Sequence, residues 1–238
     1  MELSKFPKID LQADESIDHF MEGRLRLIQS RHGYRFSIDA VLLSRFVTIA
    51  RGDVVVDLGT GCGVILLILL LTKPVGRAIG LEAQRDLATQ ALRNARLNGF
   101  ASKMEVVLGD IKRLPLVQRS ADVVVCNPPY YGIESGRINP NPHRAFARHE
   151  ILVSLDDILS TAKGLLKKRG RVALIYPAVR LADLLIRMRG FNLEPKRMQI
   201  NYPSLDSNGK LALVEASLGG RPGLEITPPV FGQGDFEM

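Results

Sequence analysis

The chain has 238 residues, of which 46% are hydrophobic and 24% charged, as is typical of globular proteins and not of disordered or collagen-like chains. Its 32 Lys and Arg residues exceed its 25 Asp and Glu residues, and the net charge of +7 permits an anionic partner without requiring one. Two cysteines are too few for a disulfide framework, so we expect a reduced, cytoplasmic protein. The start lacks the apolar core of a secretory signal, and the longest apolar run, Val64 to Leu71, is too short to span a bilayer.

The first fifty residues are predicted to form an N-terminal extension. We expect the first twenty to be loosely ordered. Basic and apolar residues alternate in Arg24–Ser30, and a turn and the segment Tyr34-Arg35-Phe36 follow, which predicts a short β-hairpin. Ser37 is a favoured N-cap for a helix over Ile38–Ile49, where apolar residues recur at helical spacing.

From residue 51 onward, strand and helix patterns alternate. Strands are predicted at Asp53–Asp57, Val75–Leu81, Met104–Leu108, Ala121–Cys126 and Arg171–Tyr176, with a closing antiparallel pair at Phe191–Asn201 and Leu211–Leu218. Helices are predicted at Val64–Thr72, Gln84–Asn98, from the N-cap Ser154 through Lys168, and at Ala178–Arg189. This alternation predicts an α/β fold with a mostly parallel sheet and helices on both faces. We therefore expect an extension over 1–50, one domain over 51–218, and an extended or partly disordered tail over 219–238.

A glycine-rich segment, Asp57-Leu58-Gly59-Thr60-Gly61-Cys62-Gly63, links the strand at Asp53–Asp57 to an apolar helix. Glycines there let the backbone turn tightly and let a ligand approach closely. The spacing is G-x-G-x-G, whereas dinucleotide sites carry G-x-G-x-x-G, which disfavours a nicotinamide oxidoreductase. The carboxylate of Asp57 can lie near a cationic or amine-bearing ligand.

Three more motifs follow strand ends, where open α/β sheets bind ligands. Glu82 can accept hydrogen bonds from the ribose hydroxyls of a nucleoside. Asp110 can accept from an adenine amino group while Ile111 packs on the ring, although Asp is equally favoured there as a helix N-cap. The segment Asn127-Pro128-Pro129-Tyr130 can orient a substrate amino group through the Asn oxygen and a backbone carbonyl fixed by the prolines. Tyr130 offers a flat face on which a base can stack.

In this order, DLGTGCG, Glu82, GDI and NPPY resemble the class I S-adenosylmethionine-dependent methyltransferases, and NPPY resembles the motif of members that methylate an exocyclic or amide nitrogen. The flanking segments YRFSIDAVLL, ARHE, LVEA and GGRPG are similar to the tRNA1(Val) adenine-37 N6-methyltransferase family. The resemblance implies S-adenosylmethionine as cofactor and an adenine N6 in tRNA, next to the anticodon of a valine tRNA, as target. The candidate residues are Asp57, Gly59, Gly61, Glu82, Asp110 and Ile111 for the cofactor, and Asn127, Pro128 and Tyr130 for catalysis.

Two windows of basic residues suit a phosphate backbone. The first runs from Arg24 to Arg35, and the second holds the candidate RNA contacts Arg137, Arg144 and Arg148 just after NPPY. Each of these arginines can equally be an ordinary solvated side chain. No ligand set with zinc spacing occurs, so we expect no metal, and Cys62 and Cys126 are interpreted as small buried fillers.

Three alternatives to a tRNA methyltransferase stay open. A protein-glutamine methyltransferase also uses NPPY, but members of that family are expected to carry a longer helical substrate domain before the glycine loop. Only 58 residues precede Gly59 here, which disfavours this alternative. A DNA-adenine methyltransferase would be expected to carry an additional target-recognition domain. A non-catalytic RNA-binding module on the same fold is disfavoured because the motif residues are all present.

Overall fold

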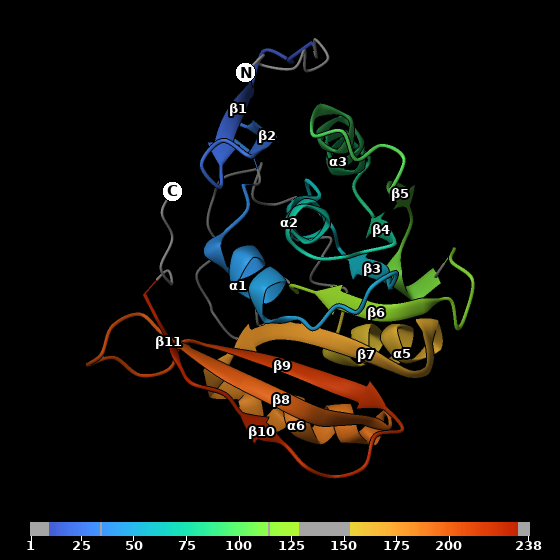
Figure 1. Ribbon diagram of the computed structural model, residues 1–238, viewed down its shortest axis with the longest axis vertical. Helices are drawn as coiled ribbons and strands as arrows, with labels where there is room; N and C mark the ends of the chain where they lie inside the picture. The colour runs from blue at the N-terminus through green and yellow to red at the C-terminus, as the bar shows by residue number, and fades with distance from the viewer. Residues whose placement is uncertain (1–9, 34, 114, 129–152, 233–238) are drawn as a thin grey trace.

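The computed structural model of the protein describes residues 10–33, 35–113, 115–128 and 153–232 (Figure 1). Its centre is a nine-stranded sheet in the order β10-β8-β9-β7-β6-β3-β4-β5, with β11 also paired to β8. The strands are β3 (Val54–Leu58), β4 (Arg77–Glu82), β5 (Met104–Leu108), β6 (Ala121–Cys126), β7 (Leu166–Pro177), β8 (Leu193–Tyr202), β9 (Leu211–Leu218), β10 (Glu225–Ile226) and β11 (Val230–Phe231). Strands β3 to β7 run parallel, and β9 is antiparallel to both β7 and β8. The predicted α/β fold and its closing antiparallel pair are confirmed.

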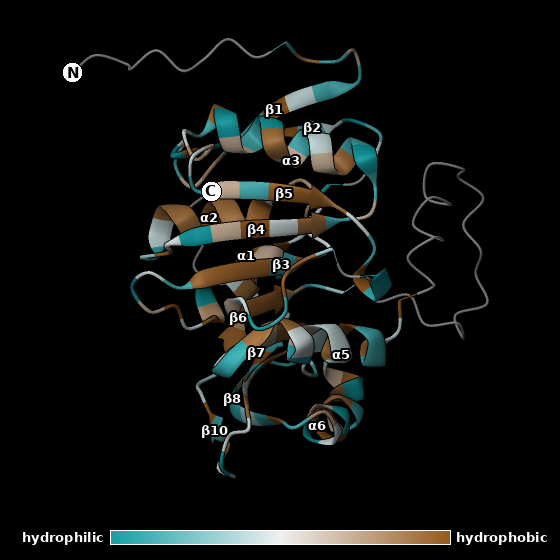
Figure 2. Ribbon diagram, turned by 90° about the vertical axis from the view of Figure 1, so that its right-hand side faces the viewer, coloured by the Kyte–Doolittle hydropathy of each residue, from teal (hydrophilic) through white to brown (hydrophobic). Residues whose placement is uncertain are grey.

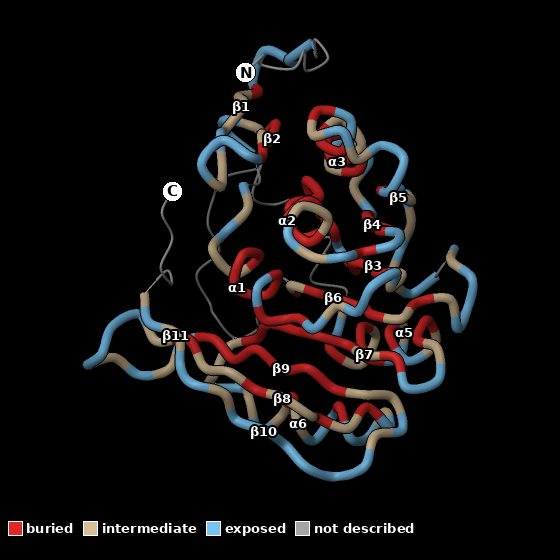
Figure 3. Tube along the Cα trace, in the orientation of Figure 1, coloured by how far each residue is buried: buried red, intermediate tan, exposed pale blue. Residues whose placement is uncertain are grey.

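Helices cover both faces of this sheet, as Figure 1 shows. They are α1 (Ile38–Phe46), α2 (Val64–Thr72), α3 (Arg85–Leu97), α5 (Leu155–Leu165) and α6 (Leu181–Gly190), with the short 3-10 turns η1 (Ile111–Arg113) and η3 (Ala178–Arg180). Helices α1, α2 and α3 share one buried apolar cluster, and α5 and α6 share another on the opposite face. Because both faces are covered, the central strands are apolar on both sides (Figure 2) and buried along most of their length (Figure 3).

Helix α2 has the bounds that its sequence predicts. The segment VILLILLLT carries no charge, and Val64 to Leu69 are all buried. A helix that is apolar all round requires burial on all sides, and α2 obtains it from the sheet, α1 and the strand β2 (Leu25–Ser30). None of the described helices is long and apolar enough to cross a membrane.

The predicted end of the helix at Lys168 is wrong, although its start is confirmed. The Ser154 hydroxyl accepts a hydrogen bond from the Asp157 backbone N–H, and the Asp157 carboxylate accepts from the Ser154 N–H, which forms a capping box. The helix ends at Leu165, and β7 begins at Leu166 and not at Arg171. Leu166 is buried and pairs with a residue of β6, so burial beside the sheet outweighs continuation of the helix.

The N-terminal hairpin differs from its prediction. Strand β2 pairs antiparallel with β1 (Glu15–Phe20) and not with the segment that follows it, and the described Arg35 and Phe36 lie in no strand. Met21, Glu22 and Gly23 all have positive φ, which builds a tight turn between the two strands. The expectation of loose order is therefore wrong for Glu15–Phe20, whereas residues 1–9 and Tyr34 lie outside the described residues.

The chain after Gly219 is extended along the edge of β8 up to residue 232. Strands β10 and β11 each pair in parallel with β8 over two residues. At β11, Asn201 of β8 also donates side-chain hydrogen bonds to the carbonyls of Val230 and Gly232. The tail therefore has a defined path because it pairs with β8, which is distant in the sequence. A local periodicity in the tail sequence does not reveal such a contact. The division of the chain at residues 50 and 218 stays a prediction.

Candidate active site

The four predicted motifs follow the parallel strands β3, β4, β5 and β6 and therefore lie at one edge of the sheet. Backbone contacts connect them. Gly59 and Thr60 donate to the Leu81 carbonyl at 2.9 and 3.0 Å, and Gly109 donates to the Glu82 carbonyl at 2.9 Å. The Cys126 thiol donates to the Leu58 carbonyl at 3.1 Å, which places the start of NPPY beside the glycine loop. The structure thus brings the predicted motifs together at the carboxyl end of the sheet.

The glycine loop needs glycine for two different reasons. Gly59, Gly61 and Gly63 have φ of 79°, 56° and 86°, a conformation that side-chain-bearing residues rarely adopt. A Cβ on Gly59 would meet no atom of the described residues within 4 Å, so the loop is open at that point. A Cβ on Gly63 would instead lie 2.7 Å from the Met104 side chain and 3.3 Å from that of Ala91. The first glycine leaves room for a ligand, and the third permits close packing against α3.

Glu82 is buried beneath the loop, with only 3% of its surface exposed. Its Oε2 accepts a hydrogen bond from the Gly61 N–H at 2.8 Å, and its Oε1 accepts from the Gln84 N–H at 2.9 Å. Burial raises the pKa of Glu82, while these backbone donors oppose that rise. A carboxylate can accept about four hydrogen bonds, so Glu82 retains capacity for a ligand.

Asp57 is fully buried on β3, and its two oxygens have different surroundings. Oδ2 accepts from the Thr60 hydroxyl at 2.8 Å, whereas Oδ1 has no hydrogen-bond partner among the described residues. Burial raises the pKa of Asp57 to about 7; the hydrogen bond from Thr60 opposes this rise, and the negative charge of Glu82 adds a smaller contribution to it. Buried acceptors are rarely left unsatisfied in proteins. Oδ1 of Asp57 is therefore available to accept a hydrogen bond from a ligand, and a cationic donor would interact with it most favourably.

Asp110 and Ile111 follow β5. Asp110 is exposed, and its Oδ1 accepts from the Lys112 N–H at 2.9 Å, so its side chain caps η1. This is the capping role that the sequence left open, and the predicted contact to a cofactor stays a prediction. Ile111 is half-buried against the cluster beneath α5, and its carbonyl accepts from the Thr161 hydroxyl at 3.0 Å.

The catalytic and RNA-contacting residues are only partly described. Asn127 is half-buried and Pro128 is buried directly after β6. Pro129, Tyr130 and the three candidate arginines Arg137, Arg144 and Arg148 lie outside the described residues. Their proposed roles therefore stay predictions.

Both cysteines are buried, as predicted. Burial raises the pKa of Cys62 to about 12, so its thiol stays protonated and is a poor nucleophile at neutral pH. Among the described residues, no three His, Cys, Asp or Glu side chains form a group that could hold a metal ion.

Sequence reasoning missed two residues that shape the loop. Thr60 supplies the hydroxyl bonded to Asp57, and Gly80 of β4 lies against it, because a Cβ on Gly80 would be 2.6 Å from the Thr60 methyl group. A glycine inside a strand often marks a close approach of another segment. That signal was present in the segment RAIGLE.

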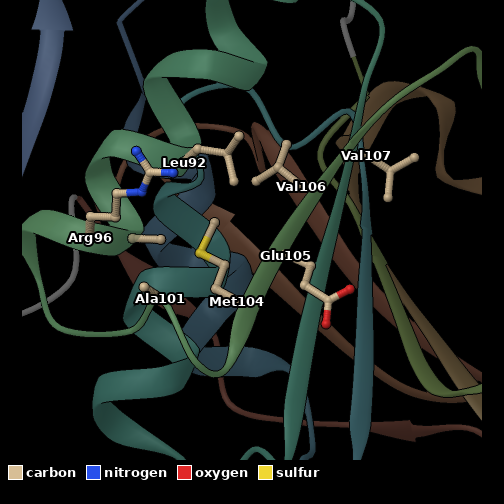
Figure 4. A pocket seen from close by; sticks show the side chains of 8 residues that line it. Leu92, Arg96, Ala101, Met104, Glu105, Val106 and Val107 are labelled. Atoms are coloured by element: carbon tan, nitrogen blue, oxygen red, sulfur yellow. The ribbon is translucent and has the colours of Figure 1, made fainter.

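A cavity of about 360 Å³ lies between α3 and β5 (Figure 4), and its lining residue Met104 also packs against Gly63 of the glycine loop. Its lining residues are Leu92, Ala95, Arg96, Ala101, Met104, Glu105, Val106 and Val107. None of the predicted site residues contributes to it, so we do not assign it to the candidate active site.

A glycine-rich turn with buried acids at the ends of adjacent parallel strands defines an α/β protein built to bind a nucleotide-like cofactor. The family model described as "Methyltransferase domain" matches residues 49–201. Two relatives, from Porphyromonas gingivalis and Parabacteroides distasonis, are both named tRNA1(Val) (adenine(37)-N6)-methyltransferase. The first is 31% identical over 189 residues, covering 76% of this chain and 73% of the relative; the second is 31% identical over 200 residues, covering 84% and 83%.

Solved structures share the fold. A structure described as a predicted O-methyltransferase from Agrobacterium tumefaciens matches with a TM-score of 0.64 and 21% identity, covering 81% of this chain and 86% of that one. A geranyl diphosphate C-methyltransferase from Streptomyces coelicolor matches with a TM-score of 0.56 and 16% identity, covering 75% and 79%. The chain belongs to the methyltransferase domain family and, within it, to the family of its tRNA1(Val) (adenine(37)-N6)-methyltransferase relatives. The family resemblance predicted from the sequence is confirmed.

Proposed function

We propose that this chain transfers the methyl group of S-adenosylmethionine to N6 of an adenine in tRNA. The substrate is suggested by the names of the relatives. The structural observation that carries the proposal is the buried Asp57, whose unpartnered Oδ1 lies beside an open glycine loop and the buried Glu82. A cofactor with a cationic amino group and ribose hydroxyls supplies the donors that these two carboxylates lack.

The residues at this edge fit that cofactor. When bound, it supplies an electrophilic methyl group on a sulfonium. Asp57 would attract its positive charge, Glu82 would accept from the ribose, and Gly59 and Gly61 would let it approach the backbone. Asp110 and Ile111, one strand further along, are proposed to hold the adenine. No residue of the chain needs to become a covalent intermediate, because the target nitrogen would attack the methyl carbon directly. The S–CH3 bond would break, the sulfur would leave as the neutral thioether of S-adenosylhomocysteine, and the methylated nitrogen would lose one proton to solvent.

The substrate side is proposed to begin at Asn127. Its side-chain oxygen would accept from the adenine amino group and aim the nitrogen lone pair at the methyl carbon, which is a positioning effect. Pro128 restricts the backbone there, and Tyr130 would stack on the base. A paired N6 is poorly accessible, so the target adenine would lie in a loop, as next to an anticodon, or be flipped out of its stack.

The phosphate backbone of the tRNA would be bound by Arg137, Arg144 and Arg148, which lie after NPPY in the sequence. The surplus of basic residues suits this partner. We further propose that the chain acts in the cytoplasm and that residues 51–218 form the catalytic domain, preceded by the extension 1–50 and followed by the tail 219–238.

The deciding experiment incubates the protein with total tRNA and labelled S-adenosylmethionine and then analyses the nucleosides. We expect the label in N6-methyladenosine. The variant Asn127→Ala should lower the single-turnover rate at least about tenfold, ~1.4 kcal/mol in the barrier, because a contact to the reacting amine is lost. Its affinity for S-adenosylhomocysteine should stay near wild type in calorimetry. Labelling of DNA or protein in place of tRNA, or a wild-type rate for Asn127→Ala, would contradict the proposal.

A further inference from the structure

Two asparagines, Asn94 of α3 and Asn98 at the C-cap of that helix, bind the N-terminal hairpin in a way that imitates a neighbouring strand. Asn98 accepts from the Arg26 N–H at 2.9 Å and donates to the Arg26 carbonyl at 2.7 Å. Asn94 accepts from the Ile28 N–H at 2.7 Å and donates to the Ile28 carbonyl at 3.1 Å. Each amide thus pairs with both backbone groups of one residue of β2, on the edge of that strand that β1 leaves free.

Asn94 also reaches the glycine loop. Its Nδ2 donates a second hydrogen bond to the Cys62 carbonyl at 2.9 Å, and the Asn94 side chain is fully buried. One turn earlier on the same face of α3, Ala91 packs against Gly63 so closely that a Cβ there would lie 3.3 Å away. Helix α3 therefore contacts two consecutive residues of the loop, Cys62 and Gly63. The residue that contacts Cys62, Asn94, also binds β2.

The shared amide has no spare donor. Its two N–H groups serve the Ile28 and Cys62 carbonyls, and its oxygen serves the Ile28 N–H. A buried polar group without a partner costs roughly 1–3 kcal/mol, so the orientation that satisfies all three groups is strongly favoured. Displacement of β2 would free the Asn94 amide to rotate. The Cys62 carbonyl of the glycine loop would then lose the hydrogen-bond donor that fixes its position.

We infer that Asn94 is a positioning residue that couples the hairpin β1–β2 to the cofactor loop, so that a docked hairpin is required for full cofactor affinity. The coupling presupposes the cofactor site proposed above. By linkage it is reciprocal: a ligand that orders the loop also stabilises the docking of β2.

The first test uses the unmodified protein and amide hydrogen exchange. Saturating S-adenosylhomocysteine is expected to slow exchange of the Arg26 and Ile28 amides at least about threefold, although both lie on β2 and outside the loop. Unchanged exchange at both amides, with ligand bound, would overturn the coupling. A wild-type protein that binds no ligand in calorimetry would overturn the coupling together with the proposed cofactor site, and this outcome is separately recognisable.

The second test compares Asn94→Ala with the matched control Asn98→Ala, which removes the same type of side chain and the same type of contact to β2 but leaves the loop untouched. We expect Asn94→Ala to weaken S-adenosylhomocysteine binding at least about tenfold and Asn98→Ala to change it less than about threefold. In Asn94→Ala, the ligand should no longer protect the Arg26 amide, which Asn98 still holds. A merely structural role would lower the melting temperature in both variants and leave ligand-dependent protection intact. Equal affinities in the two variants, or surviving protection in Asn94→Ala, would refute the inference, and the wild-type exchange decides it if that variant does not fold.

Discussion

Replacing Asp57 by Asn should stabilise the protein without its cofactor and at the same time weaken cofactor binding. Asp57 is fully buried, and burial raises its pKa from 3.8 to about 7. Because the folded-state pKa is raised, the ionised carboxylate costs stability above pH 7. That cost declines as the pH falls from 7 towards 4, where the folded state binds a proton that the unfolded state does not. Asparagine has the same shape and no charge, so it avoids the cost.

The magnitude follows from the shift. About three pKa units at ~1.4 kcal/mol each set a ceiling of about 4 kcal/mol above pH 7. The ceiling falls to roughly 2 kcal/mol near pH 5.5 and to about zero near pH 4. Water entry and local relaxation reduce such costs, so we expect Asp57→Asn to gain about 2–4 kcal/mol in the free energy of unfolding at pH 8.

The assay is urea denaturation of both proteins at several pH values between 4.5 and 8, without ligand, followed by calorimetry with S-adenosylhomocysteine at pH 8. The stability difference should shrink steadily as the pH falls. Glu82 is present in both proteins, so its own raised pKa largely cancels in the difference. The variant Glu105→Gln serves as a control, because the ion pair with Arg77 lowers the pKa of that exposed carboxylate and its removal should give no stabilisation. A stability difference that does not depend on pH, or wild-type ligand affinity at pH 8, would refute the reasoning.

Two further predictions concern the ligands. Glu82→Ala should weaken S-adenosylhomocysteine binding at least about tenfold in calorimetry, since it removes both the proposed ribose acceptor and the acceptor that holds the Gly61 N–H; an unchanged Kd would remove Glu82 from the proposed site. The triple replacement of Arg137, Arg144 and Arg148 by Ala should weaken tRNA binding and flatten its dependence on salt, because fewer counterions are released. The control removes the same charge from η3 and α6, by replacing Arg180, Arg187 and Arg189, each of which forms an ion pair within the protein. Identical salt slopes for the two triple variants would show that the first three arginines do not contact RNA.

The strands and helices around the site could be predicted because their signals are local. Helix α2 is uniformly apolar, and the strand DVVVD precedes a glycine run, so both were located to within a residue. The end of α3 was likewise marked by Gly99, whose φ of 75° is a conformation that glycine adopts readily. The motifs at strand ends then indicated which edge of the sheet holds the candidate site.

The errors arose where distant residues decide the structure. Strand β1 has the sequence ESIDHF, whose Glu15 reads as solvent-exposed, yet Glu15 is 6% exposed and pairs with Arg93 of α3 at 2.6 Å. The pKa of Glu15 is lowered because the hydrogen bonds from Arg93 and the Gln12 N–H outweigh the opposing effect of burial. A contact between residues 78 positions apart leaves no periodic pattern in the sequence, so the partner of β2 was sought on the wrong side.

The spacing of the two asparagine contacts also determines how β2 is aligned along the helix. Four residues along a helix advance about 6 Å, and two residues along a strand advance about 6.7 Å. Asn94 and Asn98 are four apart, and their targets Ile28 and Arg26 are two apart, so the two repeats nearly coincide. A shift of β2 by one residue would present backbone groups that face the wrong way. The matched spacing of Asn94 and Asn98 therefore fixes the register of β2 relative to α3.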